Sequence, residues 1–195
     1  MNKQRIAVGT LAAAVIATGG MSLAGGSATA RGNDPQGFAS DARGTTTVVK
    51  CDGGKPLNLR TRIVNSPFVF GETATNQEDQ AVPGATLALH GPASGTDTYL
   101  VTFSAESQVR GGDQDDWMGL EVHLDGVPID PYTAVGDVLA FSGEPSWNSN
   151  SIQFCTRVGP GSHRFEVMTN LSDFLGDSSL TGWLDDYTVS FQRFE

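Results

Sequence analysis

The chain has 195 residues, of which 22 are acidic and 12 are basic, so its formal net charge at pH 7 is −10. A surface this acidic repels nucleic acid and anionic membranes, and we therefore expect neither as a partner. The length corresponds to about one domain once a short terminal segment is set aside.

The first 30 residues are arranged like a secretory signal peptide. Lys3 and Arg5 form a positive region, residues 6–16 are apolar, and residues 28–30 form a small-residue cleavage signal. The alternative is an uncleaved membrane anchor, but polar and glycine residues from 18 to 22 interrupt the apolar run before the ~20 residues that span a bilayer. We expect a secreted, extracellular protein with no membrane span. Removal of Lys3 and Arg5 would change the net charge from −10 to −12.

The mature chain is expected to begin with a disordered leader over residues 31–44, which carry Gly, Pro, Asn and Asp without periodicity. A single domain over 45–195 follows. Segments with the two-residue alternation of half-buried strands lie at 45–51, 57–64, 68–73, 85–90, 96–109, 117–124, 151–158, 164–168 and 187–192, with shorter arms at 127–129 and 138–141. The stretches 74–84 and 143–150 are predicted to be loops.

Two turns support this interpretation. Asp125-Gly126 is a tight hairpin signal, and the run from Gly159 to Ser162 separates the two arms of a second hairpin. No long stretch has helical periodicity. The pattern predicts an all-β fold, a single jelly-roll-like antiparallel β-sandwich of about eight to ten strands. Immunoglobulin topology is the alternative, but its buried tryptophan between two cysteines is not matched, because Trp117 and Trp147 both adjoin loops.

Cys51 and Cys155 are the only two cysteines of the chain. An exported protein meets an oxidising environment, which favours a Cys51–Cys155 disulfide. A thiol nucleophile or a metal-binding pair are the alternatives. A nucleophile needs a positioned histidine base, and a zinc site needs more soft ligands than two distant cysteines supply.

Four segments carry a resemblance to known proteins: YLVTFSAES (99–107), LEVHLDGVPIDP (120–131), VGPGSHRFEV (158–167) and WLDDYTVSFQRFE (183–195). In this order they resemble a group of uncharacterised exported β-sandwich proteins of high-GC Gram-positive bacteria. The resemblance implies a fold and no activity, so it assigns no functional residue. The strand pattern is also distantly similar to the jelly rolls of the C1q and tumour-necrosis-factor type, which usually form trimers.

The most suggestive segment chemically is the acidic loop from Gly111 to Asp116. Calcium takes six to eight oxygen ligands, and Asp113, Asp115 and Asp116 on a glycine-containing loop are candidate metal ligands. The EF-hand spacing is absent. The alternative is a solvated loop whose charge discourages pairing at a sheet edge. Calcium is thus the single cofactor that the sequence suggests.

Other candidate residues are histidines and tryptophans. His123 and Glu121 share the outward face of one strand, where they could bind a metal, transfer protons or simply be solvated. Trp117 and Trp147 adjoin loops, where aromatic rings can stack on a sugar or peptide, or close the ends of the core. No sequence motif for a catalytic residue is present, so no catalytic residue is assigned.

Three functional hypotheses follow. The first is an exported, non-enzymatic module that binds an extracellular protein or glycan, with or without calcium. The second is a structural, self-assembling module whose function depends on a homo-oligomer such as a trimer. The third and weakest is an extracellular hydrolase that uses acidic residues.

Overall fold

The computed structural model describes residues 50–71, 79–131, 139–143, 145–173, 176 and 178–195. These residues belong to a compact unit that begins at Thr47. The expected signal peptide (1–30), the leader (31–44) and residues 45–49 lie outside the described residues. In the part of the chain that is described, there is no helix long and apolar enough to cross a membrane.

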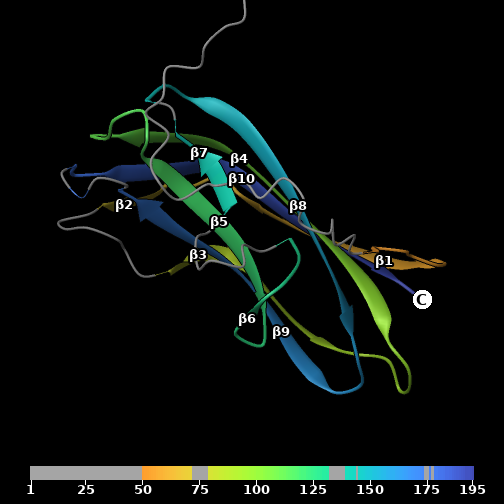
Figure 1. The fold of residues 1–195 in the computed structure, drawn as a ribbon. Helices are drawn as coiled ribbons and strands as arrows, with labels where there is room; N and C mark the ends of the chain where they lie inside the picture. Colours follow the sequence, from red (N-terminus) through yellow and green to blue (C-terminus); the bar gives the residue numbers. More distant parts are fainter. Residues whose placement is uncertain (1–49, 72–78, 132–138, 144, 174–175, 177) are drawn as a thin grey trace, which may run out of the picture. The chain divides into compact units, whose positions relative to one another are not determined.

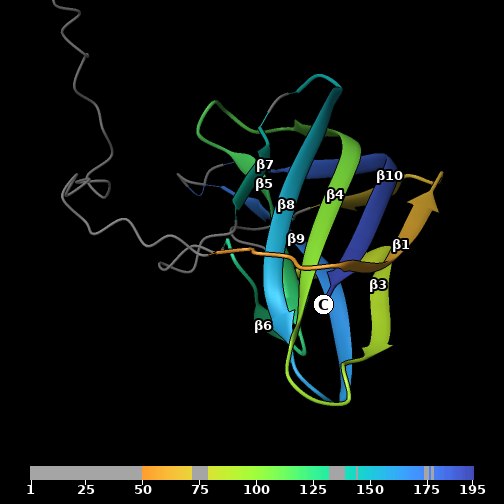
Figure 2. The same cartoon turned by 90° about the vertical axis from the view of Figure 1, so that its right-hand side faces the viewer.

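The described residues form ten strands in two antiparallel sheets (Figure 1). Their bounds are β1 (Pro56–Val64), β2 (Phe68–Gly71), β3 (Gln80–His90), β4 (Asp97–Arg110), β5 (Trp117–Leu124), β6 (Val127–Pro128), β7 (Leu139–Ser142), β8 (Asn148–Val158), β9 (Ser162–Ser172) and β10 (Thr181–Phe194). Sheet A has the order β1-β10-β4-β8, and β2 also pairs with β10. Sheet B has the order β3-β9-β5-β6, and β7 also pairs with β5. Figure 2 shows β8, β4, β10 and β1 side by side in sheet A.

Long strands that follow one another in the chain lie in different sheets. The chain passes from sheet B to sheet A between β3 and β4, returns between β4 and β5, and alternates again from β8 to β10. Each sheet therefore joins segments that are distant in sequence. The prediction of an all-β antiparallel sandwich is confirmed, and this alternation is compatible with jelly-roll-like connectivity.

The core lies between the two sheets. Val101 and Phe103 of β4 and Leu120 and Val122 of β5 are completely buried, as their alternation with polar neighbours predicted. The Phe103 ring centroid lies 5.6 Å from that of Phe141 and 5.8 Å from that of Tyr187. Aromatic contacts of this kind contribute beyond the apolar area that they bury.

Two predicted loops are wrong in part. Residues 80–84 belong to β3 although Pro83 and Gly84 favoured a loop. β3 is the outer strand of sheet B, where a missing N–H is tolerated, and the pairing with β9 shifts between Ala81 and Thr86. β8 begins at Asn148, inside the predicted loop 143–150. Cys51, in contrast, was expected at the end of a strand and precedes β1 without belonging to one.

The disulfide between Cys51 and Cys155 is present, with Cα atoms 5.9 Å apart and a sequence separation of 104. It attaches the segment before β1 to β8 in sheet A. Two hydrogen bonds hold the same segment: Thr98 Oγ1 donates to the Asp52 carbonyl at 3.1 Å, and the Glu195 amide donates to the Lys55 carbonyl at 2.9 Å. The cysteines are thus structural, and the nucleophile and metal-pair alternatives are wrong.

Candidate functional site

Two surface depressions lie beside the chain segment between β7 and β8. The first, of about 350 Å³, is lined by Phe141, Ser142, Gly143, Ser146, Asn148, Ser149 and Asn150. The second, of about 370 Å³, is lined by Val109, Gly112, Asp113, Gln114, Gly143 and Pro145. Gly143 lines both, so the two depressions are adjacent. We call the first the polar depression and the second the acidic-loop depression.

The polar depression is lined by hydroxyl and amide side chains, and none of its described lining residues is charged. Ser142 is buried, and its Oγ has no hydrogen-bond partner among the described residues. Buried polar atoms are nearly always paired, so an unpaired hydroxyl beside a depression indicates a group that a ligand or water satisfies. The lining therefore suits a neutral, hydrogen-bonding ligand.

Trp147 is the chain neighbour of two residues that line the polar depression. It lies between the lining residues Ser146 and Asn148 and is 45% exposed. The turn below it is closed by the Asn148 side-chain amide, which donates to the Ser146 carbonyl at 3.1 Å. Asn150 Nδ2 donates to Ser107 Oγ at 2.9 Å, which ties this part of β8 to β4. An exposed indole is available for stacking, and the ligand-binding role of Trp147 stays a prediction.

Hydrogen bonds between its own residues hold the acidic loop beside the second depression. Asp116 is buried, and its Oδ2 accepts hydrogen bonds from the Asp113 amide at 2.9 Å and from Ser178 Oγ at 2.7 Å. Asp113 Oδ1 accepts from the Asp115 amide at 2.8 Å. These contacts give Asp116 a structural role that joins the loop to the segment before β10. The calcium prediction for Asp113, Asp115 and Asp116 stays a prediction.

The structure brings Trp117 and Asp116, two of the predicted site residues, next to Gly143 at the end of β7. A Cβ built on Gly143 would lie 3.2 Å from the Asp116 carbonyl oxygen and 3.8 Å from Trp117 Cβ. Gly143, which directly follows β7, therefore packs on the chain that joins the acidic loop to β5. Trp117 itself is partly buried, and its Nε1 is buried with no partner within the described ranges, so its ring is less available than that of Trp147.

A different group of titratable residues converges on the outward face of sheet B. The ligand atoms of Asp79, Glu121 and His123 all lie within 4.8 Å of one another, and His123 Nε2 is 2.7 Å from Glu121 Oε2. The sequence paired Glu121 with His123 but did not include Asp79. Among the described residues, Asp113, Asp115 and Asp116 do not form a group of this kind.

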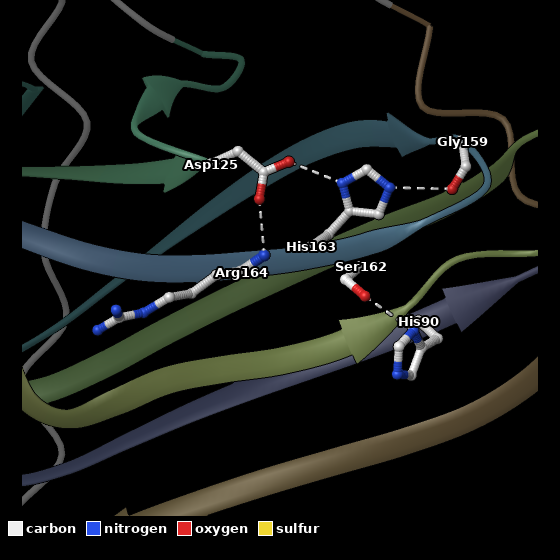
Figure 3. A network of polar contacts seen from close by, with 6 residues as sticks. All are labelled: His90, Asp125, Gly159, Ser162, His163 and Arg164. Carbon is white, nitrogen blue, oxygen red and sulfur yellow. Dashed lines mark hydrogen bonds and ion pairs between the residues drawn. The ribbon is translucent and has the colours of Figure 1, made fainter.

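His163 of β9 links the turn between β5 and β6 to the turn between β8 and β9 (Figure 3). The hairpin predicted around Gly159 to Ser162 is wrong, because β8 lies in sheet A and β9 in sheet B, so the two strands do not pair. Its Nδ1 lies 2.7 Å from Asp125 Oδ2, and its Nε2 lies 3.1 Å from the Gly159 carbonyl oxygen. Asp125 Oδ1 also accepts the Arg164 amide at 2.8 Å. Because both partners of the ring are acceptors, only the doubly protonated imidazolium can donate to both at once. His90 lies nearby and contacts Ser162 Oγ at 3.1 Å.

The hydrogen bond to Asp125 raises the pKa of His163 above its ordinary 6.5, and the same bond lowers the pKa of Asp125 below 3.8. A raised histidine pKa stabilises the fold below pH 6.5, and this contribution is lost as the pH rises through the folded value. A lowered aspartate pKa stabilises the fold above pH 3.8, and this contribution is lost as the pH falls through the folded value. The pair therefore stabilises the fold most between these two values.

We expect a His163→Asn variant to melt at a lower temperature than the wild type, by a margin that is largest near about pH 5.5 and shrinks by about pH 8.5. Thermal melts across this range test the expectation. A His90→Asn variant, which removes an imidazole that contacts a hydroxyl instead of a carboxylate, is the matched control and should show no such maximum. A margin that does not change with pH would contradict the charged pair.

Comparisons with known proteins give no family for this chain. No family model matches it, and no curated protein is similar to it in sequence. One solved structure with a similar arrangement is the C-terminal domain of EclA, described as a sugar-binding protein. The two share 12% sequence identity at a TM-score of 0.32, over 65% of this chain and 78% of the other. A likeness at this level supports no inference about ligand or activity.

Proposed function

We propose that this protein is an exported, non-enzymatic β-sandwich module that binds a neutral glycan in the polar depression. The observation that carries the proposal is the exposed Trp147, whose two chain neighbours line a depression with hydroxyl and amide groups and, among the described residues, no charged side chain. Sugars present hydroxyl groups at their edges and apolar C–H faces, which such groups and an indole ring can bind together.

Charge supports a neutral ligand. The chain carries a net charge of −10, so an anionic polymer would be repelled over long distances. A cationic partner would favour the acidic-loop depression, which contains Asp113, over the polar depression. The unpaired Ser142 Oγ adds a hydroxyl that can both donate to and accept from a sugar.

Calcium at Asp113, Asp115 and Asp116 stays part of the proposal, because Asp113 lines the neighbouring depression. An ion there would act on the ligand from the adjacent surface. Binding of the ligand in calcium and in EDTA, repeated with Asp113→Asn and Asp115→Asn, would test this part alone. Asp116 is left unchanged because its buried carboxylate holds the loop together.

The Trp147→Ala variant is expected to weaken glycan binding at least tenfold while the fold is retained, because an exposed aromatic anchor is lost and no core contact is removed. A panel of neutral oligosaccharides followed by calorimetry measures the effect, and circular dichroism monitors the fold. Val127→Ala removes another exposed apolar side chain, in the short strand β6, and is the matched control. Equal binding by both variants would place the ligand elsewhere.

Self-assembly is a second candidate because of the exposed apolar side chains of β1. Leu59 and Ile63 are 62% and 69% exposed, and β1 is the outer strand of sheet A. An outer strand with apolar side chains is a surface on which copies of a chain can pair. Light scattering of the same sample distinguishes this candidate, since an assembly has a multiple of the single-chain mass.

A further inference from the structure

The outward face of sheet B carries a cluster that the proposed glycan site does not use. Glu121 and His123 lie two positions apart on β5 and therefore share its outward face. Asp79 directly precedes β3. Their ligand atoms, two carboxylate oxygens and one imidazole nitrogen, all lie within 4.8 Å of one another. Small adjustments would let all three reach one ion at the ~2.0–2.2 Å typical of zinc bound by nitrogen and oxygen.

In the described part of the chain, no lysine or arginine pairs with the two carboxylates of this cluster. The side chains of Glu121 and His123 are only 12% and 13% exposed. Among the described residues, neither Asp79 nor Glu121 forms an ion pair with a lysine or arginine. A shielded carboxylate is costly unless hydrogen bonds or a cation compensate its charge, and a metal ion would supply that cation to Glu121.

Asn170 of β9 gives an independent observation beside the cluster. Its Nδ2 donates to Asp79 Oδ1 at 3.2 Å, which holds the Asp79 carboxylate. Its own Oδ1 is buried and has no partner in the part of the chain that the structure describes. The sheet register explains the contact, because Gln80 pairs with Thr169 and the preceding Asp79 therefore reaches Asn170. An amide can rotate to exchange its oxygen and nitrogen, so Asn170 can present an oxygen ligand where it now donates.

The ligand types distinguish between metals. Calcium and magnesium take oxygen ligands, whereas imidazole suits zinc and its transition-metal neighbours. Two carboxylates and one imidazole leave one position of a tetrahedral zinc ion for water or an external group. We infer that Asp79, Glu121 and His123 form a zinc-class divalent transition-metal site, separate from the acidic loop and from the polar depression.

Calorimetric titration of the purified, chelator-treated protein with Zn²⁺ tests this inference. We expect one ion per chain and a rise in melting temperature, because an ion that binds only the folded state stabilises it. Asp79→Asn and His123→Gln are each expected to weaken zinc binding at least tenfold. Asp79→Asn changes an exposed side chain and preserves an oxygen that accepts from Asn170, so this variant is expected to fold. It therefore tests the site even if the His123 variant does not fold.

Two controls separate this site from other zinc binding. His90→Gln removes an exposed histidine and should leave the zinc affinity unchanged, as should Asp113→Asn with Asp115→Asn. Histidine ring signals in NMR should shift for His123 on zinc addition and not for His90 or His163. Absence of zinc binding, or binding that Asp79→Asn and His123→Gln leave unchanged, would overturn the inference. Glycan binding by Trp147 is measured independently, so failure of either site does not affect the test of the other.

Discussion

Removal of the Cys51–Cys155 disulfide is expected to lower the free energy of unfolding by about 4–5 kcal/mol in the chain-entropy model, with engineered cases usually giving less. The two cysteines are 104 residues apart, so the crosslink restricts most of the folded domain in its unfolded state. Cys51 is exposed, so its replacement by serine leaves no buried cavity at that end. Urea unfolding of the Cys51→Ser/Cys155→Ser variant, compared with the oxidised wild type, measures the loss.

Reduced wild-type protein is the control for this experiment, because it loses the crosslink and retains both side chains. It should unfold at nearly the same urea concentration as the serine variant. A loss below about 1 kcal/mol would mean that the disulfide restricts the unfolded chain far less than the entropy model requires. In that case the hydrogen bonds of Asp52 and Lys55 to the rest of sheet A hold the segment before β1.

Phe103→Ala is expected to lower the free energy of unfolding by about 3–5 kcal/mol, as large-to-small substitutions of buried phenylalanine do. Phe103 is completely buried and contacts the rings of Phe141 and Tyr187, so it joins β4 and β10 of sheet A to β7 of sheet B. The truncated side chain would leave a cavity between the sheets that their paired strands cannot close. Urea unfolding with a constant slope measures the change.

Thr102→Ala is the matched control, because Thr102 is the neighbour of Phe103 on the opposite face of β4. Its hydroxyl accepts a hydrogen bond from Gln153 at the surface, and its removal should change stability by about 0.5 kcal/mol or less. Similar losses for the two variants would mean that Phe103 does not occupy the centre of the core.

The fold class followed from local patterns. Tyr99, Val101 and Phe103 occupy every second position of β4, and a side-chain period of two predicts a strand with one buried face whatever its partners are. The Asp125-Gly126 turn could also be predicted from the sequence, because this dipeptide favours the positive φ that both residues adopt. Pro83 and Gly84 misled the prediction of β3, because only the finished sheet shows that β3 is an outer strand.

The candidate sites could be predicted from the sequence only in part. Glu121 and His123 were paired because residues two apart on a strand share a face. Asp79 lies 42 positions before Glu121, and it reaches them only because β3 and β5 both pair with β9. Trp147 was identified by its type and loop position, but its depression includes residues of β7 and β8 whose proximity no local signal predicts.

The sequence by itself therefore determined most of the strands, the inward faces of β4 and β5 and the disulfide. Alternation and turn chemistry act locally, and two cysteines allow only one disulfide. Only the tertiary structure decided which side chains meet. Pairing register places Asp79 beside Glu121 and His123, and loop packing at Gly143 joins the polar depression to the acidic loop. Such contacts depend on the order of strands across a sheet, and many strand orders satisfy the same local pattern.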